Sequence, residues 1–230
     1  MNALDRAVGD LVARVTDAVI LPRFGRLSAD EVTAKTPGDY VTIADREAEA
    51  ALAEGLTRID SDTRVVGEEA CAADPSLLND IGSGRVWLVD PLDGTNNFAE
   101  GVTPFGTMIA LVENGEVMHG WLYDPVARRL CHAARGAGAF VDGQRVQASG
   151  TGRARPVATF SSYWIAAERR QAIEASAAET LELRTGLRAA AAQYPALRDG
   201  TPELPEYQRV YPSDHAAGSL FVTEAGGHVA

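Results

Sequence analysis

Hydrophobic and polar positions alternate with a helical period at the start of the chain. Apolar residues recur every three or four positions over residues 4–19, which predicts an amphipathic helix. Pro22 and Gly25 mark its end region. The same period over residues 48–56 predicts a second helix that begins within residues 42–45.

The middle third changes to short apolar runs that are typical of strands. Residues 65–66 and 86–89 look like buried strands, and each runs straight into acidic residues. Two hairpins are predicted further on, with turns at Asn114-Gly115 and Asp142-Gly143. This succession of strands predicts an antiparallel sheet.

The last third mixes a strand with helices. Residues 157–160 form a candidate strand, and residues 164–192 are rich in alanine and mostly helical in propensity. Four prolines over residues 195–212 predict an irregular loop, after which Ser213 or Asp214 can cap a final helix. Helices segregated from an antiparallel sheet indicate an α+β fold.

Composition removes several classes of function. The 230 residues are 46% hydrophobic and 23% charged, as in an ordinary globular protein. The longest strictly apolar run, residues 108–112, is too short to span a membrane. The net charge of -11 disfavours a nucleic-acid partner, although an acidic protein can still bind phosphate through divalent cations.

Two further features concern the compartment. Charged residues within the first twenty positions interrupt any signal-peptide core. Cys71 and Cys131 are too few for a disulfide scaffold and lack the spacing of metal ligands. We therefore expect a reducing cytoplasm.

The segment over residues 90–95 carries the most chemical information. Asp90 ends a buried strand, Pro91 fixes the backbone, and the following turn can bring both carboxylates and the Leu92 carbonyl to one side. Such oxygen donors suit Mg²⁺ or Mn²⁺ rather than zinc. A polar turn with Asp93-Gly94 at its tip explains the spacing equally well.

Two other acidic patches change this balance. Glu68 and Glu69 follow a short β-branched run, and Asp214 begins the final predicted helix. Taken alone, the first two are a solvated pair and the last is an N-cap. The occurrence of three such acidic patches in one chain favours a metal site over three unrelated structural roles. By contrast, His119, His132 and His228 share no ligand spacing with one another.

In this order, the acidic segments resemble those of inositol monophosphatases. The matching segments are Gly67-Glu68-Glu69, Asp90-Pro91-Leu92-Asp93-Gly94-Thr95 and Asp214-His215-Ala216-Ala217-Gly218, with Lys35, Asp39, Val41-Thr42 and Asp45 upstream. The resemblance runs from about residue 4 to the end and is weakest over residues 161–210. It implies a layered α-β-α-β-α sandwich, with an N-terminal subdomain at 1–147 and a C-terminal one at 148–230.

The resemblance also implies a function and a set of roles. It implies a Mg²⁺-dependent, lithium-sensitive phosphatase of small phosphate monoesters, commonly a homodimer, with two or three metal ions in each site. The implied metal ligands are Glu68, Asp90, the Leu92 carbonyl, Asp93 and Asp214. The implied catalytic residues are Asp45, Thr95 and Glu68. The implied phosphate and substrate contacts are Asp93, Gly94, Thr95 and Asp214.

The chain departs from the family pattern in three places. Ser213 stands where the family usually has Trp, and the usual substrate-recognition segment is hard to align over residues 161–210, where Ser176-Ala177-Ala178 matches poorly. Glu203 and Glu206 could contact a polyol or be solvated loop charges. Family members generally continue beyond the position of Ala230, so the C-terminal subdomain is expected to be shortened.

Inositol monophosphate is the leading substrate. Histidinol phosphate, fructose 1,6-bisphosphate and 3′-phosphoadenosine 5′-phosphate are alternatives. A second class of function is a non-catalytic descendant that keeps its metal site for folding or partner binding. The retained pair of Asp45 and Thr95 argues against this second class, because a purely structural metal site needs no residues that orient water.

Overall fold

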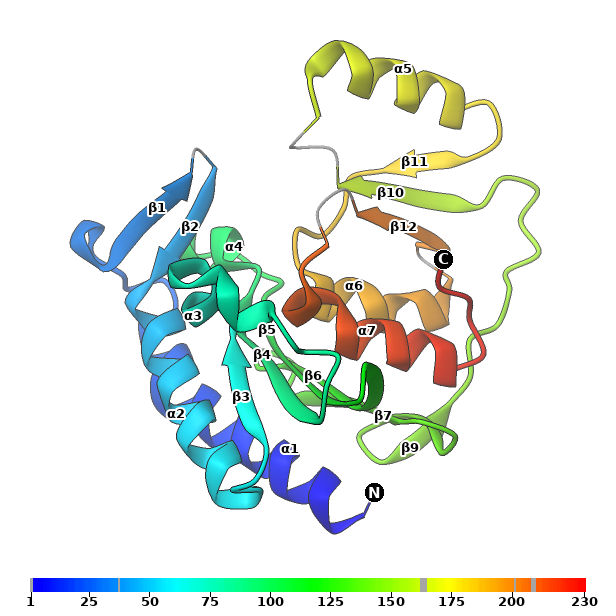
Figure 1. Cartoon of the computed structure of the whole chain (residues 1–230). Coiled ribbons are helices and arrows are strands. Elements are labelled where there is room, and N and C mark those ends of the chain that lie inside the picture. Colours follow the sequence, from blue (N-terminus) through cyan, green and yellow to red (C-terminus); the bar gives the residue numbers. More distant parts are fainter. Residues whose placement is uncertain (1, 37, 162–164, 201, 208–209) are drawn as a thin grey trace.

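Helices and sheets alternate in five layers (Figure 1). A computed structural model describes residues 2–36, 38–161, 165–200, 202–207 and 210–230. The two sheets that form layers differ in size, and a separate two-stranded sheet pairs β1 with β2. The larger has seven strands in the order β3-β4-β5-β6-β7-β8-β9, and the smaller has the order β11-β10-β12. The arrangement confirms the expected α+β class and the α-β-α-β-α sandwich.

The layers are built from the following elements. The first layer holds α1 (Ala3–Val15) and α2 (Ile43–Ile59). The second is the seven-stranded sheet of β3 (Arg64–Gly67), β4 (Arg85–Asp93), β5 (Gly106–Glu113), β6 (Glu116–Asp124), β7 (Arg129–Ala134), β8 (Gly138–Val141) and β9 (Gln144–Val146). The third layer holds α6 (Ala190–Ala196) and α7 (Pro212–Glu224). The fourth is the sheet of β10 (Val157–Ser161), β11 (Glu182–Arg184) and β12 (Leu204–Tyr207), and the fifth is α5 (Ala167–Ala177).

Three short elements lie near one edge of the large sheet. They are the hairpin of β1 (Val32–Thr36) and β2 (Asp39–Thr42), helix α3 (Glu68–Ala73) and helix α4 (Thr95–Ala99). Each precedes or follows, along the chain, a strand or helix that carries one of the acidic motifs.

The two predicted N-terminal helices are confirmed, and their starts have a local cause. Asn2 and Asp5 form a reciprocal capping box at α1, and Thr42 and Asp45 form another at α2. The first helical pattern continues beyond α1 as a π-helical turn over Thr16–Ile20. Both capping boxes place an acidic residue in a first turn, where the helix dipole favours it.

The large sheet is buried on both faces, and β4 shows how. Its side chains alternate, so that Trp87 and Val89 pack toward α1 and α2 whereas Val86 and Leu88 pack toward α6 and α7. The strand pairs β5 through β9 are antiparallel, as predicted, but β3 and β4 run parallel. Both predicted hairpin turns are present, and Asn114 adopts the positive φ of 49° that such turns require.

The last third of the chain corrects several sequence predictions. The alanine-rich stretch 164–192 is not mostly helical: α5 ends at Ala177, β11 follows, and α6 begins at Ala190. Residues 195–212 are not wholly irregular, because they include β12. Parallel pairing with β10 makes β11 a strand despite the helical propensity of its segment, and makes β12 a strand despite the prolines around it.

The start of α7 also differs from the prediction. Tyr211 is the N-cap, and Pro212 occupies the first turn, where its missing N–H costs no hydrogen bond. Ser213 and Asp214 therefore lie inside the first turn rather than at the cap. This places the Asp214 carboxylate on a helix that packs against the large sheet.

Helix α7 approaches the large sheet very closely at one strand. A Cβ at Gly120 of β6 would lie 2.9 Å from the Cα and the carbonyl oxygen of Ala217. A Cβ at Gly218 would lie 1.9 Å from the ring of Tyr194 on α6. The absence of a side chain at Gly120 lets the backbones of β6 and α7 lie in near contact, and the absence of one at Gly218 lets the Tyr194 ring of α6 lie against the backbone of α7.

The predicted boundary between the two subdomains coincides with the change from one sheet to the other. The division between residues 147 and 148 falls between β9, the last strand of the large sheet, and β10, the first of the small one. The division into two subdomains stays a prediction.

Within the described ranges, no helix has both the length and the apolar character needed to cross a membrane.

Substitution of Gly218 by alanine tests the close packing of α6 and α7. In an exposed helix Gly→Ala is stabilising, but here we expect a loss of about 1–3 kcal/mol in the free energy of unfolding, because the methyl group overlaps the Tyr194 ring. Urea denaturation measures it. Thr223→Ala, on the exposed side of the same helix, is the control and should change stability by less than about 0.5 kcal/mol. An unchanged or higher stability of Gly218→Ala would contradict the packing described here.

Candidate metal centre

Three carboxylates from separate elements converge at one edge of the large sheet. They are Glu68 at the start of α3, Asp90 in β4 and Asp214 in the first turn of α7, and each offers an oxygen within 4.8 Å of the others. The first two meet because β3 and β4 are parallel neighbours in which Gly67 pairs with Val89. Helix α7 supplies the third. This group could hold a metal ion.

Burial makes the group electrostatically unfavourable without a cation. Asp90 is only 2% exposed, and desolvation raises its pKa well above the ordinary range, with Glu68 and Asp93 adding repulsion. Desolvation also raises the pKa of Asp93 to about 7, although the backbone amides of Ala191 and Ala190 partly offset it. Oxygen donors that repel one another in a buried place fit a hard divalent cation.

Lys35 of β1 brings positive charge to this edge. Its Nζ lies 2.9 Å from Glu68 Oε1 and 2.6 Å from Glu69 Oε1. Burial opposes the charge of the ammonium group, but the two glutamates outweigh this effect and raise the pKa of Lys35. One ammonium group therefore compensates part of the negative charge of the site.

Asp93 lies beside the group of three rather than within it. Its Oδ2 accepts a hydrogen bond of 2.7 Å from the backbone N–H of Ala191, in the first turn of α6. Strand β4 extends through Pro91 and Leu92 to Asp93, and its register against β5 is irregular between Asp90 and Asp93. The amide of Leu92 donates to Asp90 Oδ1 at 3.0 Å, which fixes that carboxylate.

Asp45 and Thr95 form a second polar unit next to the carboxylates. Thr95 Oγ1 lies 2.9 Å from Asp45 Oδ1 and 2.8 Å from the Leu92 carbonyl oxygen, and its single proton can serve one of them at a time. Asp45 is fully buried, and desolvation raises its pKa to about 6 against the hydrogen bonds from Thr42 and Thr95. The unit can accept and hold a proton near neutral pH.

Gly94 makes the turn that separates Asp93 from Thr95. Its φ of 82° lies in the left-handed region that favours glycine, and a Cβ there would lie 3.0 Å from the Cβ of Ala189 and 3.1 Å from the Pro104 oxygen. The turn ends β4 and starts α4, so that Thr95 points back toward Leu92.

The structure adds residues that sequence reasoning missed. Glu49 of α2 accepts hydrogen bonds from the amides of Glu69 and Ala70 at 2.7 and 2.9 Å and so anchors the start of α3 beside Glu68. The sequence feature that could have identified Glu49 is its position four residues after Asp45, which puts both residues on the same face of α2. Lys35 is among the upstream residues that resemble the family motif, but the sequence alone assigns it no role.

Several other sequence expectations find their place. His215, which follows Asp214 in α7, is 7% exposed, and its Nδ1 lies 2.9 Å from the Tyr194 hydroxyl. Ser213 donates to Asp214 Oδ1 at 2.7 Å. Glu203 accepts from the amide of Val157 at 2.9 Å, which gives it a structural role at β10. Ser176-Ala177-Ala178 lies at the end of α5, in the outermost layer.

A cavity of about 440 Å³ opens beside Glu68. Its lining includes Lys35, Asp39, Tyr211 and Ser213. A small ester could occupy such a volume next to the carboxylates.

Comparisons with known proteins agree with this geometry. Residues 5–230 match the model of the inositol monophosphatase family. The fructose-1,6-bisphosphatase/inositol-1-monophosphatase of Thermotoga maritima is 30% identical over 230 residues, which cover 100% of this chain and 84% of that protein. A histidinol-phosphatase of Chlorobaculum parvum is 38% identical over 138 residues, which cover 60% of this chain and 51% of that protein.

A solved structure gives the same result for the fold. The extragenic suppressor protein suhB of Bartonella henselae superposes with a TM-score of 0.83 at 26% identity, over 98% of this chain and 85% of that one. The family is metal-dependent, and its phosphatase-named members identify the enzyme class. This chain therefore belongs to the inositol monophosphatase family and is a phosphoric monoester hydrolase.

Proposed function

We propose that this chain hydrolyses a small phosphate monoester with the help of Mg²⁺, and that inositol monophosphate is its preferred substrate. The observation that carries the proposal is the convergence of Glu68, Asp90 and Asp214 beside the hydrogen-bonded pair of Asp45 and Thr95. A cation site next to a proton acceptor is the arrangement that phosphate ester hydrolysis requires.

The donor set supports Mg²⁺, with Mn²⁺ as a substitute. The proposed ligands are the carboxylates of Glu68, Asp90, Asp93 and Asp214 with the Leu92 carbonyl, and all of them are oxygen donors. Two or three ions are proposed for each site. When bound, they neutralise the ester's negative charge and lower the pKa of an attacking water.

The chain's own residues then manage the proton. Asp45 is fixed by Thr42, and Thr95 Oγ1 lies within hydrogen-bond reach of it. We propose that a water on Thr95 passes its proton through the hydroxyl to Asp45, whose pKa of about 6 suits a general base near neutral pH. Glu68 is proposed to orient the same water from the opposite side.

The phosphate is proposed to lie against the turn at Gly94. A glycine there would let the backbone approach a ligand closely, and the amides of Gly94 and Thr95 with the Thr95 hydroxyl would contact phosphate oxygens. Asp93 and Asp214 would act on the phosphate through the ions they hold, since bare carboxylates repel an anion.

The alcohol part of the ester is proposed to extend into the cavity bordered by Lys35, Asp39, Tyr211 and Ser213. The names of the relatives support phosphate esters of polyols and sugars as the class, and they differ in the individual substrate. Lithium inhibition, a homodimer and a cytoplasmic location stay predictions of the family resemblance.

A panel of phosphate esters tests the proposal directly. We expect Mg²⁺-dependent, Li⁺-inhibited phosphate release, with the highest kcat/KM on inositol monophosphate among that ester, fructose 1,6-bisphosphate, histidinol phosphate and 3′-phosphoadenosine 5′-phosphate. The Asp90→Asn/Asp214→Asn double variant is the inactive control. If another ester gave the highest kcat/KM, the proposed substrate would be wrong, but the proposed Mg²⁺-dependent hydrolysis would stand. No release from any ester by a chain that still binds Mg²⁺ would favour the non-catalytic alternative.

Thr95→Ala tests the proton path. Loss of the hydroxyl should lower kcat by about 10²–10⁴-fold and change Mg²⁺ affinity little, because the hydroxyl handles a proton rather than holding an ion. Steady-state kinetics at saturating Mg²⁺ and calorimetric Mg²⁺ titration measure the two effects. Thr57→Ala, at an exposed threonine of α2, is the control. A large loss of Mg²⁺ binding with normal kcat at saturating metal would contradict the assigned role.

The raised pKa of Asp93 predicts how stability depends on pH without metal. A carboxyl whose pKa rises on folding contributes stability while it is protonated, and loses that contribution as the pH increases. In chelator, the free energy of unfolding should therefore fall between about pH 4 and about pH 7, from the ordinary pKa of 3.8 to the raised value of about 7. Urea denaturation at several pH values measures this fall.

Two controls make that result specific. Asp93→Asn should flatten part of the pH dependence, and saturating Mg²⁺ should restore the stability of the parent chain at pH 7. A free energy of unfolding that rises with pH over this range in chelator would contradict the charge repulsion on which the site is built.

A further inference from the structure

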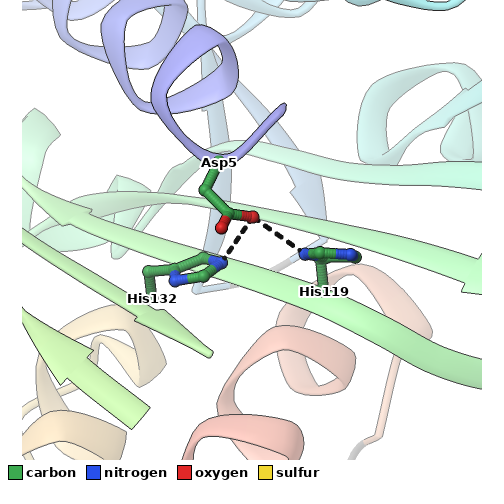
Figure 2. Close-up of side chains that lie close together, drawn as sticks. All are labelled: Asp5, His119 and His132. Atoms are coloured by element: carbon green, nitrogen blue, oxygen red, sulfur yellow. Dashed lines mark hydrogen bonds and ion pairs between the residues drawn. The ribbon is translucent and has the colours of Figure 1, made fainter. Parts of the chain in front are cut away.

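A second cluster of metal-binding residue types lies on the other side of the large sheet. Figure 2 shows Asp5 from α1 between His119 of β6 and His132 of β7. Asp5 Oδ1 lies 2.9 Å from His119 Nδ1 and 3.0 Å from His132 Nε2. The sequence gives no sign of this cluster, because the three residues are far apart along the chain and meet only when β6 pairs with β7 and α1 packs on that face of the sheet.

The cluster is separate from the candidate catalytic centre. His119 shares its face of β6 with Trp121, which packs in the hydrophobic core formed with α1 and α2. Asp90 shares its face of β4 with Leu88, which packs toward α6 and α7. The two groups therefore lie on opposite faces of the same sheet.

His132 has few polar neighbours for a buried imidazole. Its side chain is 2% exposed, and among the described residues its Nδ1 has no hydrogen-bond partner, while its Nε2 faces Asp5 Oδ1 at 3.0 Å without a well-directed hydrogen bond. A buried imidazole and carboxylate that face each other in this way call for an explanation, and an ion bound by both Nε2 and Oδ1 is one.

The Asp5 carboxylate is already oriented for a ligand. Its Oδ2 accepts a hydrogen bond of 2.8 Å from the Asn2 amide in the α1 capping box, which leaves Oδ1 for the two histidines. Trp121 Nε1 also donates to the Asp5 carbonyl oxygen at 3.2 Å. A carboxylate held by such outer contacts is typical of metal ligands.

We propose that Asp5 Oδ1, His119 Nδ1 and His132 Nε2 bind one divalent transition metal of the zinc type. Two imidazoles and a carboxylate are donors that Zn²⁺ accepts readily, and Mg²⁺ has little preference for imidazole nitrogen. A tetrahedral ion with bonds of about 2.0–2.1 Å separates its ligand atoms by about 3.3 Å. The observed separations of 2.9 and 3.0 Å need only a small expansion to reach it.

A water completes the fourth position. The side chain of His119 is 19% exposed, whereas those of Asp5 and His132 are 4% and 2% exposed, so the ion and the water enter along His119. Binding displaces the protons that the imidazoles hold at their ligating nitrogens. The bound ion links the first turn of α1 to β6 and β7, and this linkage stabilises the N-terminal layer.

Co²⁺ as a spectroscopic probe tests the site on the whole chain. The catalytic oxygens favour six-coordinate Co²⁺, which absorbs weakly, whereas a tetrahedral site with two nitrogens gives strong visible bands. With excess Mg²⁺ present, we expect one equivalent of Co²⁺ to give the strong bands and Zn²⁺ to abolish them. The Asp90→Asn/Asp214→Asn double variant should give the same bands.

Variants of the histidines separate this site from an ordinary hydrogen-bonded cluster. His119→Gln, at a partly exposed position, should remove the strong bands and weaken Co²⁺ binding at least about tenfold. His228→Gln, at an exposed histidine, is the matched control and should keep both. Zn²⁺ should raise the Tm of the parent chain and of His228→Gln but not that of His119→Gln.

Other outcomes would overturn the proposal. They are weak bands only, bands that disappear in the Asp90→Asn/Asp214→Asn double variant, or equal Co²⁺ binding by His119→Gln and the parent chain. A lower Tm of His119→Gln with no metal effect in any variant would show that the cluster serves only to attach α1. None of these results depends on phosphatase activity, so the proposed function stands or fails separately.

Discussion

Mutual repulsion among three converging carboxylates, one buried and two half-buried, is the constraint on which the rest of this structure depends. Glu68, Asp90 and Asp214 approach within 4.8 Å of one another, and burial raises the pKa of Asp90. The protein supplies only part of the compensation, through the Lys35 ammonium and the amide of Leu92. Such a group is able to hold a cation, and under the proposed function the bound cations would let a phosphate ester approach a site that is no longer strongly negative.

The scaffold must hold this repulsive group against its tendency to separate. The large sheet does so because both of its faces are covered, one by α1 and α2 and the other by α6 and α7. The carboxylates come from the ends of neighbouring parallel strands and from one helix, and none depends on a long loop. Glu49 adds a further restraint where β3 passes into α3, since its carboxylate holds two amides of that turn.

Much of this arrangement could be predicted from local patterns. The period of residues 4–19, the start of the second helix within residues 42–45 and the Asn114-Gly115 turn each depend on a few neighbouring residues, and the structure confirms them. The acidic residues after two buried strands could also be identified as site candidates. Their convergence could not, because it depends on β3 and β4 being parallel neighbours.

The failures have a common physical cause. Strands β11 and β12 exist because β10 offers them hydrogen bonds, and neither has a strong pattern of its own. His132 meets Asp5 only after β6 and β7 pair and α1 packs across them, so no spacing in the chain indicates the cluster. Contacts of this kind follow from tertiary structure and have no local signature.

The near contact between Gly120 and Ala217 has a consequence for how this enzyme tolerates mutation. Because α7 rests on β6 through its main chain, this contact sets how near the backbone of Asp214 lies to the large sheet, and the side-chain rotamers can adjust the carboxylate only within that limit. Any side chain at position 120 would lift the helix and carry Asp214 away from its neighbours. A genetic screen for inactive variants should therefore recover substitutions at a residue that touches neither ion nor ester, and their defect would be a weaker hold on the metal in a chain that is still folded.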